Sequence, residues 1–154
     1  MLQPNKILVI RFSSLGDLIL TSPIFRELRR IFPGANLNLL TSVGFGDVLD
    51  NNPHLDRIIK HPRKENFEQL NQLIEVLQVE EFDLIYDAHR SMRSRWIVSK
   101  LTAFGMKRKP AVWKINKRTL NRKMLIHLGW NRLQQGLSQR EQWLLPLKQH
   151  APHG

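Results

Sequence analysis

Short apolar runs and longer amphipathic segments alternate along this chain. The first run, residues 6–12 (Lys-Ile-Leu-Val-Ile-Arg-Phe), is typical of a strand buried on both faces of a parallel sheet. A short loop follows, and then one helical stripe formed by Leu18, Phe25, Leu28 and Phe32, which ends at Pro33-Gly34. The regular helix could instead begin later, at Ser22-Pro23. Further strands are expected at residues 37–41, 57–60, 82–87 and 110–113, a short helix or turn at 44–51, and helices at 66–79, 91–104, 118–130 and 138–149.

This alternation indicates repeated strand–helix–strand units. The expected fold class is therefore α/β, with a Rossmann-like, doubly wound and mostly parallel sheet. Residues 1–149 account for the whole pattern as one domain, which is an ordinary size for a single core. Residues 150–154, His-Ala-Pro-His-Gly, are typical of a linker or of a point where a longer chain was cut.

The amino-acid composition excludes several kinds of functional site. The chain has no cysteine, so disulfides, thiol catalysis and cysteine-type zinc sites are excluded, and its histidines show no metal-binding spacing. The N-terminus lacks the basic segment, long apolar segment and small-residue cleavage site of a secretory signal, and no apolar run approaches the roughly 18 residues of a membrane span. A cytoplasmic location is expected from these features.

Positive charge is concentrated in the second half of the chain. Residues 1–87 hold 9 Lys or Arg and 12 Asp or Glu, whereas residues 88–140 hold 14 Lys or Arg and no acidic residue. The formal net charge is +11. Such a field attracts polyanions, which include nucleic acid, a phosphorylated glycolipid and an anionic membrane surface.

The loop after the first strand is the prime candidate for a binding site, because ligands of doubly wound sheets bind beyond the carboxyl ends of the strands. Ser13, Ser14 and Gly16 are small, so their backbone N–H groups can approach an anion closely. Asp17 then lies near the first turn of a helix, where its carboxylate is either a proton acceptor or an ordinary capping residue. The loop lacks the Gly-x-Gly-x-x-Gly pattern and the P-loop lysine, which disfavours a nicotinamide or ATP enzyme.

Two segments of the chain resemble a known family. Residues 6–17 (Lys-Ile-Leu-Val-Ile-Arg-Phe-Ser-Ser-Leu-Gly-Asp), followed by Thr21-Ser22-Pro23, Leu28-Arg29 and Phe32-Pro33, resemble the opening of the ADP-heptose:lipopolysaccharide heptosyltransferases, glycosyltransferase family 9. Residues 82–89 (Phe-Asp-Leu-Ile-Tyr-Asp-Ala-His), followed by Arg93-Ser94, are similar to the family's fourth-strand segment and the helix after it. The resemblance extends from residue 6 to about residue 123 and is most specific in the first segment.

The resemblance implies a GT-B glycosyltransferase of two Rossmann-like domains, of which this chain is the N-terminal, acceptor-binding one. It implies an inverting transfer of heptose from ADP-heptose to the Kdo-containing inner core of lipopolysaccharide, with Asp17 as the base and no metal or other cofactor. Ser13, Ser14 and Gly16 would lie beside the reacting groups and the donor pyrophosphate. The family's C-terminal domain would hold most of the ADP-heptose site; we expect this sequence to lack it, so the chain is expected to be inactive by itself.

Five basic residues are candidate contacts for the anionic acceptor, Kdo-lipid A. Arg63 and Lys64 follow the third strand, and Lys117 and Arg118 follow the fifth, at a helix start where a cation opposes the helix dipole. Arg93 lies at the start of the helix after the fourth strand, as an anion contact or as part of a solvated face. Peripheral contact with the anionic inner membrane of a Gram-negative bacterium fits the same charge.

Two other functions remain open at this point. The basic segment, with Trp96, Trp113 and Trp130 among its cations, also fits a nucleic-acid-binding domain, although it contains no recognisable reader motif and no specific nucleic acid is expected. A non-catalytic scaffold derived from the enzyme is the second alternative.

Overall fold

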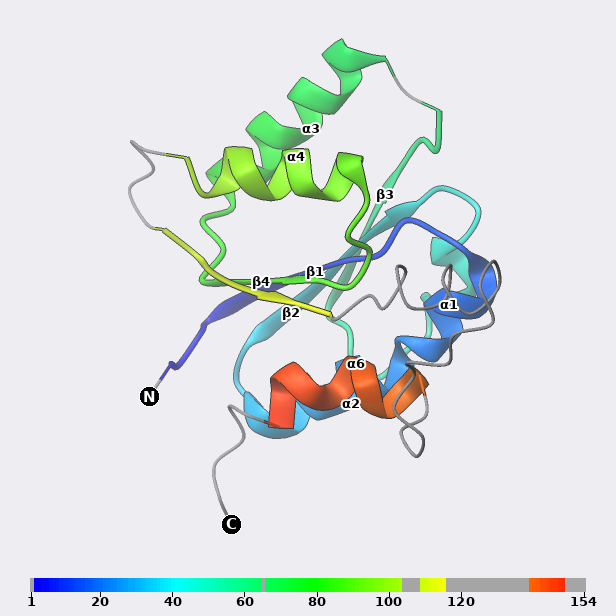
Figure 1. Ribbon diagram of the computed structural model, residues 1–154, viewed down its shortest axis with the longest axis vertical. Helices are drawn as coiled ribbons and strands as arrows, with labels where there is room; N and C mark the ends of the chain where they lie inside the picture. The colour runs from blue at the N-terminus through cyan, green and yellow to red at the C-terminus, as the bar shows by residue number, and fades with distance from the viewer. Residues whose placement is uncertain (1, 65, 104–108, 116–138, 149–154) are drawn as a thin grey trace, which may run out of the picture.

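The computed structural model describes residues 2–64, 66–103, 109–115 and 139–148, which fold into a sheet covered by helices on both faces (Figure 1). Every strand pairing among these residues is parallel, and the strand order is β3-β2-β1-β4-β5. This order matches the first five strands of the Rossmann order 3-2-1-4-5-6, so the expected fold class is confirmed. The strands are β1 (Lys6–Ile10), β2 (Asn36–Ser42), β3 (Arg57–His61), β4 (Leu84–Asp87) and β5 (Ala111–Lys114).

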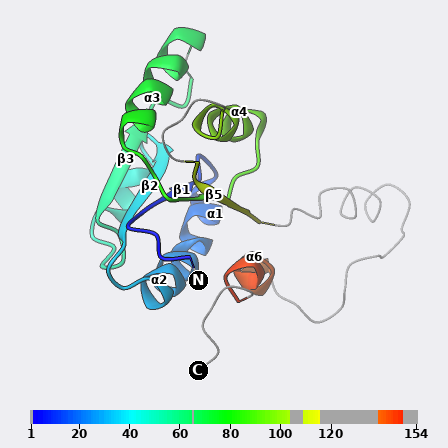
Figure 2. The same ribbon diagram turned by 90° about the vertical axis from the view of Figure 1, so that its left-hand side faces the viewer.

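The helices form the two outer layers. Figure 1 shows α3 and α4 above the sheet and α2 and α6 below it, and the turned view of Figure 2 shows the same division. The predicted helix at 118–130 lies outside the described residues. The others are α1 (Leu15–Leu20), α2 (Ser22–Ile31), the 3-10 turn η1 (Gly46–Leu49), α3 (Phe67–Val79), α4 (Met92–Leu101) and α6 (Gln139–Lys148).

The amphipathic stripe after β1 is divided between two helices. The backbone N–H of Thr21 donates to the carbonyls of Asp17 and Leu18, which closes α1, and Thr21 is then the N-cap of α2. Pro23 follows within the first turn of α2, where its missing N–H costs nothing, whereas in a continuous helix its ring would clash with the carbonyl of Ile19. A helix therefore begins at Ser22, as the second alternative predicted, but its N-cap is Thr21, and a separate helix before it contains Asp17.

The strand β1 lies at the centre of two apolar cores. Ile7 and Val9 pack on the side of α2 and α6, while Leu8 and Ile10 pack on the side of α3 and α4. Successive side chains of a strand point to opposite faces, so an uninterrupted apolar run is what a two-sided sheet requires.

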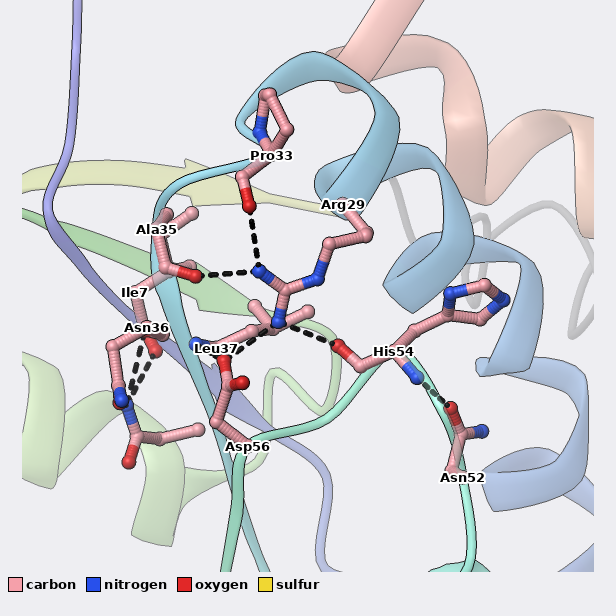
Figure 3. A network of polar contacts seen from close by, with 10 residues as sticks. Ile7, Arg29, Pro33, Ala35, Asn36, Leu37, Asn52, His54 and Asp56 are labelled. Carbon is pink, nitrogen blue, oxygen red and sulfur yellow. Dashed lines mark hydrogen bonds and ion pairs between the residues drawn. The ribbon is translucent and has the colours of Figure 1, made fainter.

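Hydrogen bonds from Arg29 connect the end of α2 to the residues that precede β2 and β3 (Figure 3). Its Nη1 donates to the carbonyls of Pro33 (3.1 Å) and Ala35 (2.7 Å). Its Nη2 donates to the carbonyl of His54 (3.1 Å) and to Oδ2 of Asp56 (2.6 Å). One guanidinium thereby fixes the turn into β2 and the approach to β3.

Because all described strands are parallel, their carboxyl ends lie at one edge of the sheet. We call this the carboxyl edge. It gathers the loop after β1, the turn after β2, residues 62–64 after β3 and residues 88–91 after β4. Residues that are far apart in sequence thus come together where Rossmann-like sheets bind ligands.

Candidate functional site

Asp17 lies at the carboxyl edge, in the first turn of α1. Its carboxylate forms an ion pair with the guanidinium of Arg11, the residue that follows β1 directly. The side chain of Asp17 is 35% exposed, whereas that of Arg11 is 4% exposed. The carboxylate is therefore held from inside the protein and still open to solvent on the other side.

Arg11 is the buried anchor of this loop. Its backbone N–H donates to the carbonyl of Leu40 in β2, and its Nη1 donates to the carbonyl of Ala88 after β4 (2.5 Å). Burial lowers the pKa of the Arg11 guanidinium, and the carboxylates of Asp17 and Asp87 act in the opposite direction. The guanidinium thus connects the loop after β1 to both neighbouring strands.

Asp87, the last residue of β4, organises the next loop. It is buried, and its Oδ1 accepts hydrogen bonds from the backbone N–H groups of His89 (3.0 Å) and Arg90 (2.7 Å). Its Oδ2 accepts from Oγ of Ser94 in α4 (3.2 Å). These contacts support a sharp turn in which Arg90 has a φ of 51°.

Sequence reasoning assigned no role to Arg11 or Asp87. Each is a charged residue at the end of an otherwise apolar strand run, and that position is the signal that could have identified them. A buried charge requires a partner, so both positions predict a polar contact at the carboxyl edge.

The loop before Asp17 is open, as its small residues led us to expect. Ser14 is the N-cap of α1, yet its side chain forms no capping hydrogen bond. Ser14 and Gly16 are exposed and Ser13 is half-buried. A Cβ placed on Gly16 would meet no atom within 4 Å, so the space beside it is unfilled. The assignment of these three residues to the donor pyrophosphate stays a prediction.

Arg93 has a different environment from that of a solvated cation. Its guanidinium lies over the ring of Phe12, 3.8 Å from the centroid, and its Nη2 donates to the carbonyl of Pro62 (3.0 Å). The ring of His89 meets Phe12 edge-on at 5.7 Å. Arg93 therefore joins the start of α4 to the loops after β1 and β3, and anion binding by it stays a prediction.

Arg63 and Lys64 lie at the carboxyl edge, as expected, and both are exposed. The guanidinium of Arg63 is 5.9 Å from the ring centroid of Phe45, in the turn after β2. Lys117 and Arg118 lie outside the described residues. The structure thus brings Arg63, Lys64 and Arg93 to the same edge as Asp17.

No three His, Cys, Asp or Glu side chains among the described residues come together as a metal site requires. No helix in the same residues has the length and apolar character to cross a bilayer.

Two curated relatives match this sequence. Lipopolysaccharide heptosyltransferase 1 of Pseudomonas aeruginosa is 27% identical over 118 residues, which cover 69% of this chain and 33% of the relative. Lipopolysaccharide heptosyltransferase 1 of Escherichia coli is 26% identical over 111 residues, which cover 66% of this chain and 34% of the relative. The chain therefore spans about a third of the length of each. No family model matches the sequence.

Two solved glycosyltransferase structures share the fold. A glycosyltransferase of family 9 from Veillonella parvula matches with a TM-score of 0.65 and 21% identity, over 77% of this chain and 38% of that one. The E. coli heptosyltransferase WaaC with ADP-2-deoxy-2-fluoro heptose matches with a TM-score of 0.57 and 21% identity, over 91% of this chain and 54% of that one. The resemblance to the heptosyltransferase family is thus confirmed for a part of those proteins.

Proposed function

We propose that this relative of the lipopolysaccharide heptosyltransferases is the acceptor-binding part of a glycosyltransferase. In the proposed reaction, heptose passes from ADP-heptose to the Kdo-containing inner core of lipopolysaccharide. The observation that carries the proposal is the Asp17 carboxylate. It lies at the carboxyl edge and is held by the buried Arg11, and the Asp17 side chain is 35% exposed to solvent.

Asp17 is proposed as the general base of one direct displacement. The acceptor hydroxyl oxygen forms a bond to the anomeric carbon, its proton passes to the Asp17 carboxylate, and the bond from that carbon to the ADP oxygen breaks with its electron pair. Attack opposite the leaving group inverts the anomeric centre. Arg11 supports this role because it fixes the direction of the carboxylate without covering it.

The donor and acceptor are proposed to meet at the carboxyl edge. The open loop of Ser13, Ser14 and Gly16 faces the donor pyrophosphate, and Arg63 and Lys64 contact the carboxylates and phosphates of the acceptor. Such an acceptor lies in the cytoplasmic leaflet of the inner membrane, so the site of action is proposed to be there. Because the chain spans about a third of its relatives, we expect it to bind the acceptor and not to transfer heptose without a donor domain.

Acceptor binding tests the proposal with the 154-residue chain itself. Kdo-lipid A in detergent micelles is titrated against the protein, and duplex and single-stranded DNA of equal charge are titrated in parallel. The variant Arg63→Gln/Lys64→Gln should weaken Kdo-lipid A binding roughly tenfold, the loss of two exposed charge pairs. The control Arg26→Gln/Arg30→Gln removes two exposed cations from α2, on the other side of the sheet, and should leave binding unchanged.

Three results would count against the proposal. DNA binding as tight as Kdo-lipid A binding would favour the nucleic-acid alternative. An equal loss in both double variants would indicate attraction to the net charge and not a site at the carboxyl edge. The absence of acceptor binding in the parent chain would leave only a structural or scaffolding role.

A further inference from the structure

We propose that the outward side of α4, with Phe67 of α3, docks this protein on the surface of an anionic lipid bilayer. We call this surface the α4 face. It consists of Phe67, Met92, Arg95, Trp96 and Lys100. The inference goes beyond the proposed reaction, and it rests on the exposure, spacing and charge of these side chains alone.

The helical spacing of α4 separates this face from the core. Met92, Trp96 and Lys100 follow one another at intervals of four residues, and Arg95 lies one turn after Met92. The opposite side of the helix, with Ile97, Val98 and Leu101, is buried against the sheet and α3. The fold of α4 is therefore stabilised without the residues of the α4 face.

Large apolar side chains gather on the α4 face although they are exposed to solvent. Met92 is 88% exposed, Phe67 64% and Trp96 38%. The rings of Phe67 and Trp96 pair across the two helices with centroids 5.9 Å apart. Single exposed apolar residues are normal, but a contiguous group of this kind marks an interaction surface.

Cations accompany these apolar residues. The ammonium of Lys100 lies 4.7 Å from the ring centroid of Trp96, and Arg95 is exposed beside it. The helix α4 contains no acidic residue, and the nearest acid in sequence to this face is the exposed Glu68. Arg63 and Lys64 extend the positive charge in the loop before α3.

This combination fits a lipid headgroup region better than it fits another protein. Tryptophan and phenylalanine side chains partition into the interface, and lysine and arginine extend apolar stems through it while their charged ends contact anionic headgroups. The opposing surface of a protein would have to supply both acidic groups and an apolar pocket. An anionic bilayer supplies both everywhere.

Docking by the α4 face would also orient the molecule. Helices α3 and α4 both begin at the carboxyl edge, and Figure 1 shows them together on one side of the sheet. Phe67 and Met92 are the first residues of these helices. Contact of their amino ends with a bilayer would bring the carboxyl edge close to the lipid surface.

Vesicle co-sedimentation tests the docking surface with the full chain. Vesicles of phosphatidylglycerol and phosphatidylethanolamine should bind the protein at least tenfold more tightly than vesicles of phosphatidylcholine, and high salt should reduce the difference. Arg95→Gln and Lys100→Gln should each weaken binding about fivefold. Met92→Ser/Trp96→Ser should weaken it roughly tenfold through the loss of inserted apolar area.

Matched controls separate the α4 face from general properties of the protein. Val79→Ser changes an 83% exposed apolar residue at the far end of α3, and Arg26→Gln removes a cation on the opposite side of the sheet. Both controls should bind vesicles like the parent. Circular dichroism establishes that each variant is folded. Arg95 and Lys100 are exposed, so their replacement should not change the fold.

Several outcomes would overturn the proposal. Equal binding to anionic and neutral vesicles, or no binding by the parent chain, would do so directly. Concentration-dependent self-association that Met92→Ser/Trp96→Ser abolishes, without any change in vesicle binding, would assign the face to a protein contact. The vesicles contain no lipopolysaccharide, so a negative result leaves the proposed acceptor site untouched.

Discussion

A buried arginine holds the carboxylate of Asp17 at the edge of the sheet. Burying the Arg11 guanidinium costs solvation energy, and the ion pair with Asp17, the carbonyl of Ala88 and the nearby charge of Asp87 offset that cost. The same contacts set the path of two loops. Arg11 therefore contributes both to the stability of the carboxyl edge and to the position of the proposed base.

Replacement of Arg11 tests its contribution to the stability of the carboxyl edge. Arg11→Met removes the charge but keeps much of the apolar stem, so it leaves Asp17 and Asp87 without their common cation. We expect the free energy of unfolding to fall by about 3 kcal/mol, because one partner of a buried pair is removed. Urea denaturation measures the change. Arg30→Met, at an exposed ion pair with Glu27, is the control and should change stability by about 0.5 kcal/mol or less; an equal effect of both variants would refute the anchoring role.

Replacement of Asp17 tests its proposed role as the base. Asp17→Asn keeps the shape of the side chain but removes its ability to accept a proton. In a protein that joins these residues to a donor domain, ADP release should fall by roughly 10²- to 10⁴-fold. The affinity for Kdo-lipid A should change little, since the proton acceptor acts only as the bond forms. Turnover close to that of the parent would exclude Asp17 as the base.

At the scale of elements, the α-helices α1, α3 and α4 of the described residues begin at the carboxyl edge and are capped differently. Asn66 and Ser91 form complete capping boxes at the starts of α3 and α4, with Gln69 and Ser94 as the reciprocal partners. Ser14 occupies the same position before α1 without any side-chain capping bond. The hydroxyl of Ser14 is thus not used for the stability of its helix.

This contrast predicts opposite effects of two similar substitutions. Asn66→Ala should destabilise the protein by about 1 kcal/mol, the typical contribution of a side-chain cap. Ser14→Ala should change stability by a few tenths of a kcal/mol at most. It should weaken the binding of ADP-heptose, because the loop is proposed to face the donor pyrophosphate. Thermal unfolding and ligand titration of both variants provide the comparison. A loss of stability in Ser14→Ala as large as that in Asn66→Ala would assign its hydroxyl to the fold.

The elements themselves were largely predictable, because each described strand is an apolar run and each long helix an apolar stripe. The division between α1 and α2 was left as one of two alternatives, since only the hydrogen bonds of Thr21 decide where the first helix closes. The carboxyl-edge position of Asp17 was predictable, because the residue follows the first strand of a predicted parallel sheet. Its ion pair with Arg11 did not follow, because local patterns do not reveal which side chains meet across a loop.

At the scale of the whole molecule, carboxylates stabilise the end of the sheet opposite the proposed site. The Asp56 carboxylate binds Arg29 at the approach to β3, and Glu80 binds both Lys6 in β1 and Arg57 in β3. These ion pairs join the end of α2, the end of α3 and the first residues of two strands. The amino ends of the strands are thus joined by acid–base pairs, on the side of the sheet away from Asp17.

The two carboxylates give the fold a defined sensitivity to acid. At Asp56, burial opposes ionisation, but hydrogen bonds from the Leu37 backbone N–H and from Arg29 prevail and lower the pKa. At Glu80, hydrogen bonds from Lys6 and Arg57 lower the pKa of the carboxyl. A carboxyl whose pKa is lower in the folded state binds fewer protons there than in the unfolded chain, so stability increases with pH across the interval between the two values.

Their contribution should therefore be complete above the ordinary carboxyl pKa of about 4 and be lost as the pH falls further. The urea midpoint of the parent chain should change little on this account between pH 7 and pH 5 and decrease between pH 4 and pH 3. The double variant Asp56→Asn/Glu80→Gln should be less stable at pH 7 and show a shallower decrease below pH 4. Arg29→Gln should lower the urea midpoint at pH 7. It should also reduce the share of the decrease below pH 4 that protonation of Asp56 causes. Parallel pH profiles of the parent and the double variant would show that other groups control the acid unfolding of the sheet.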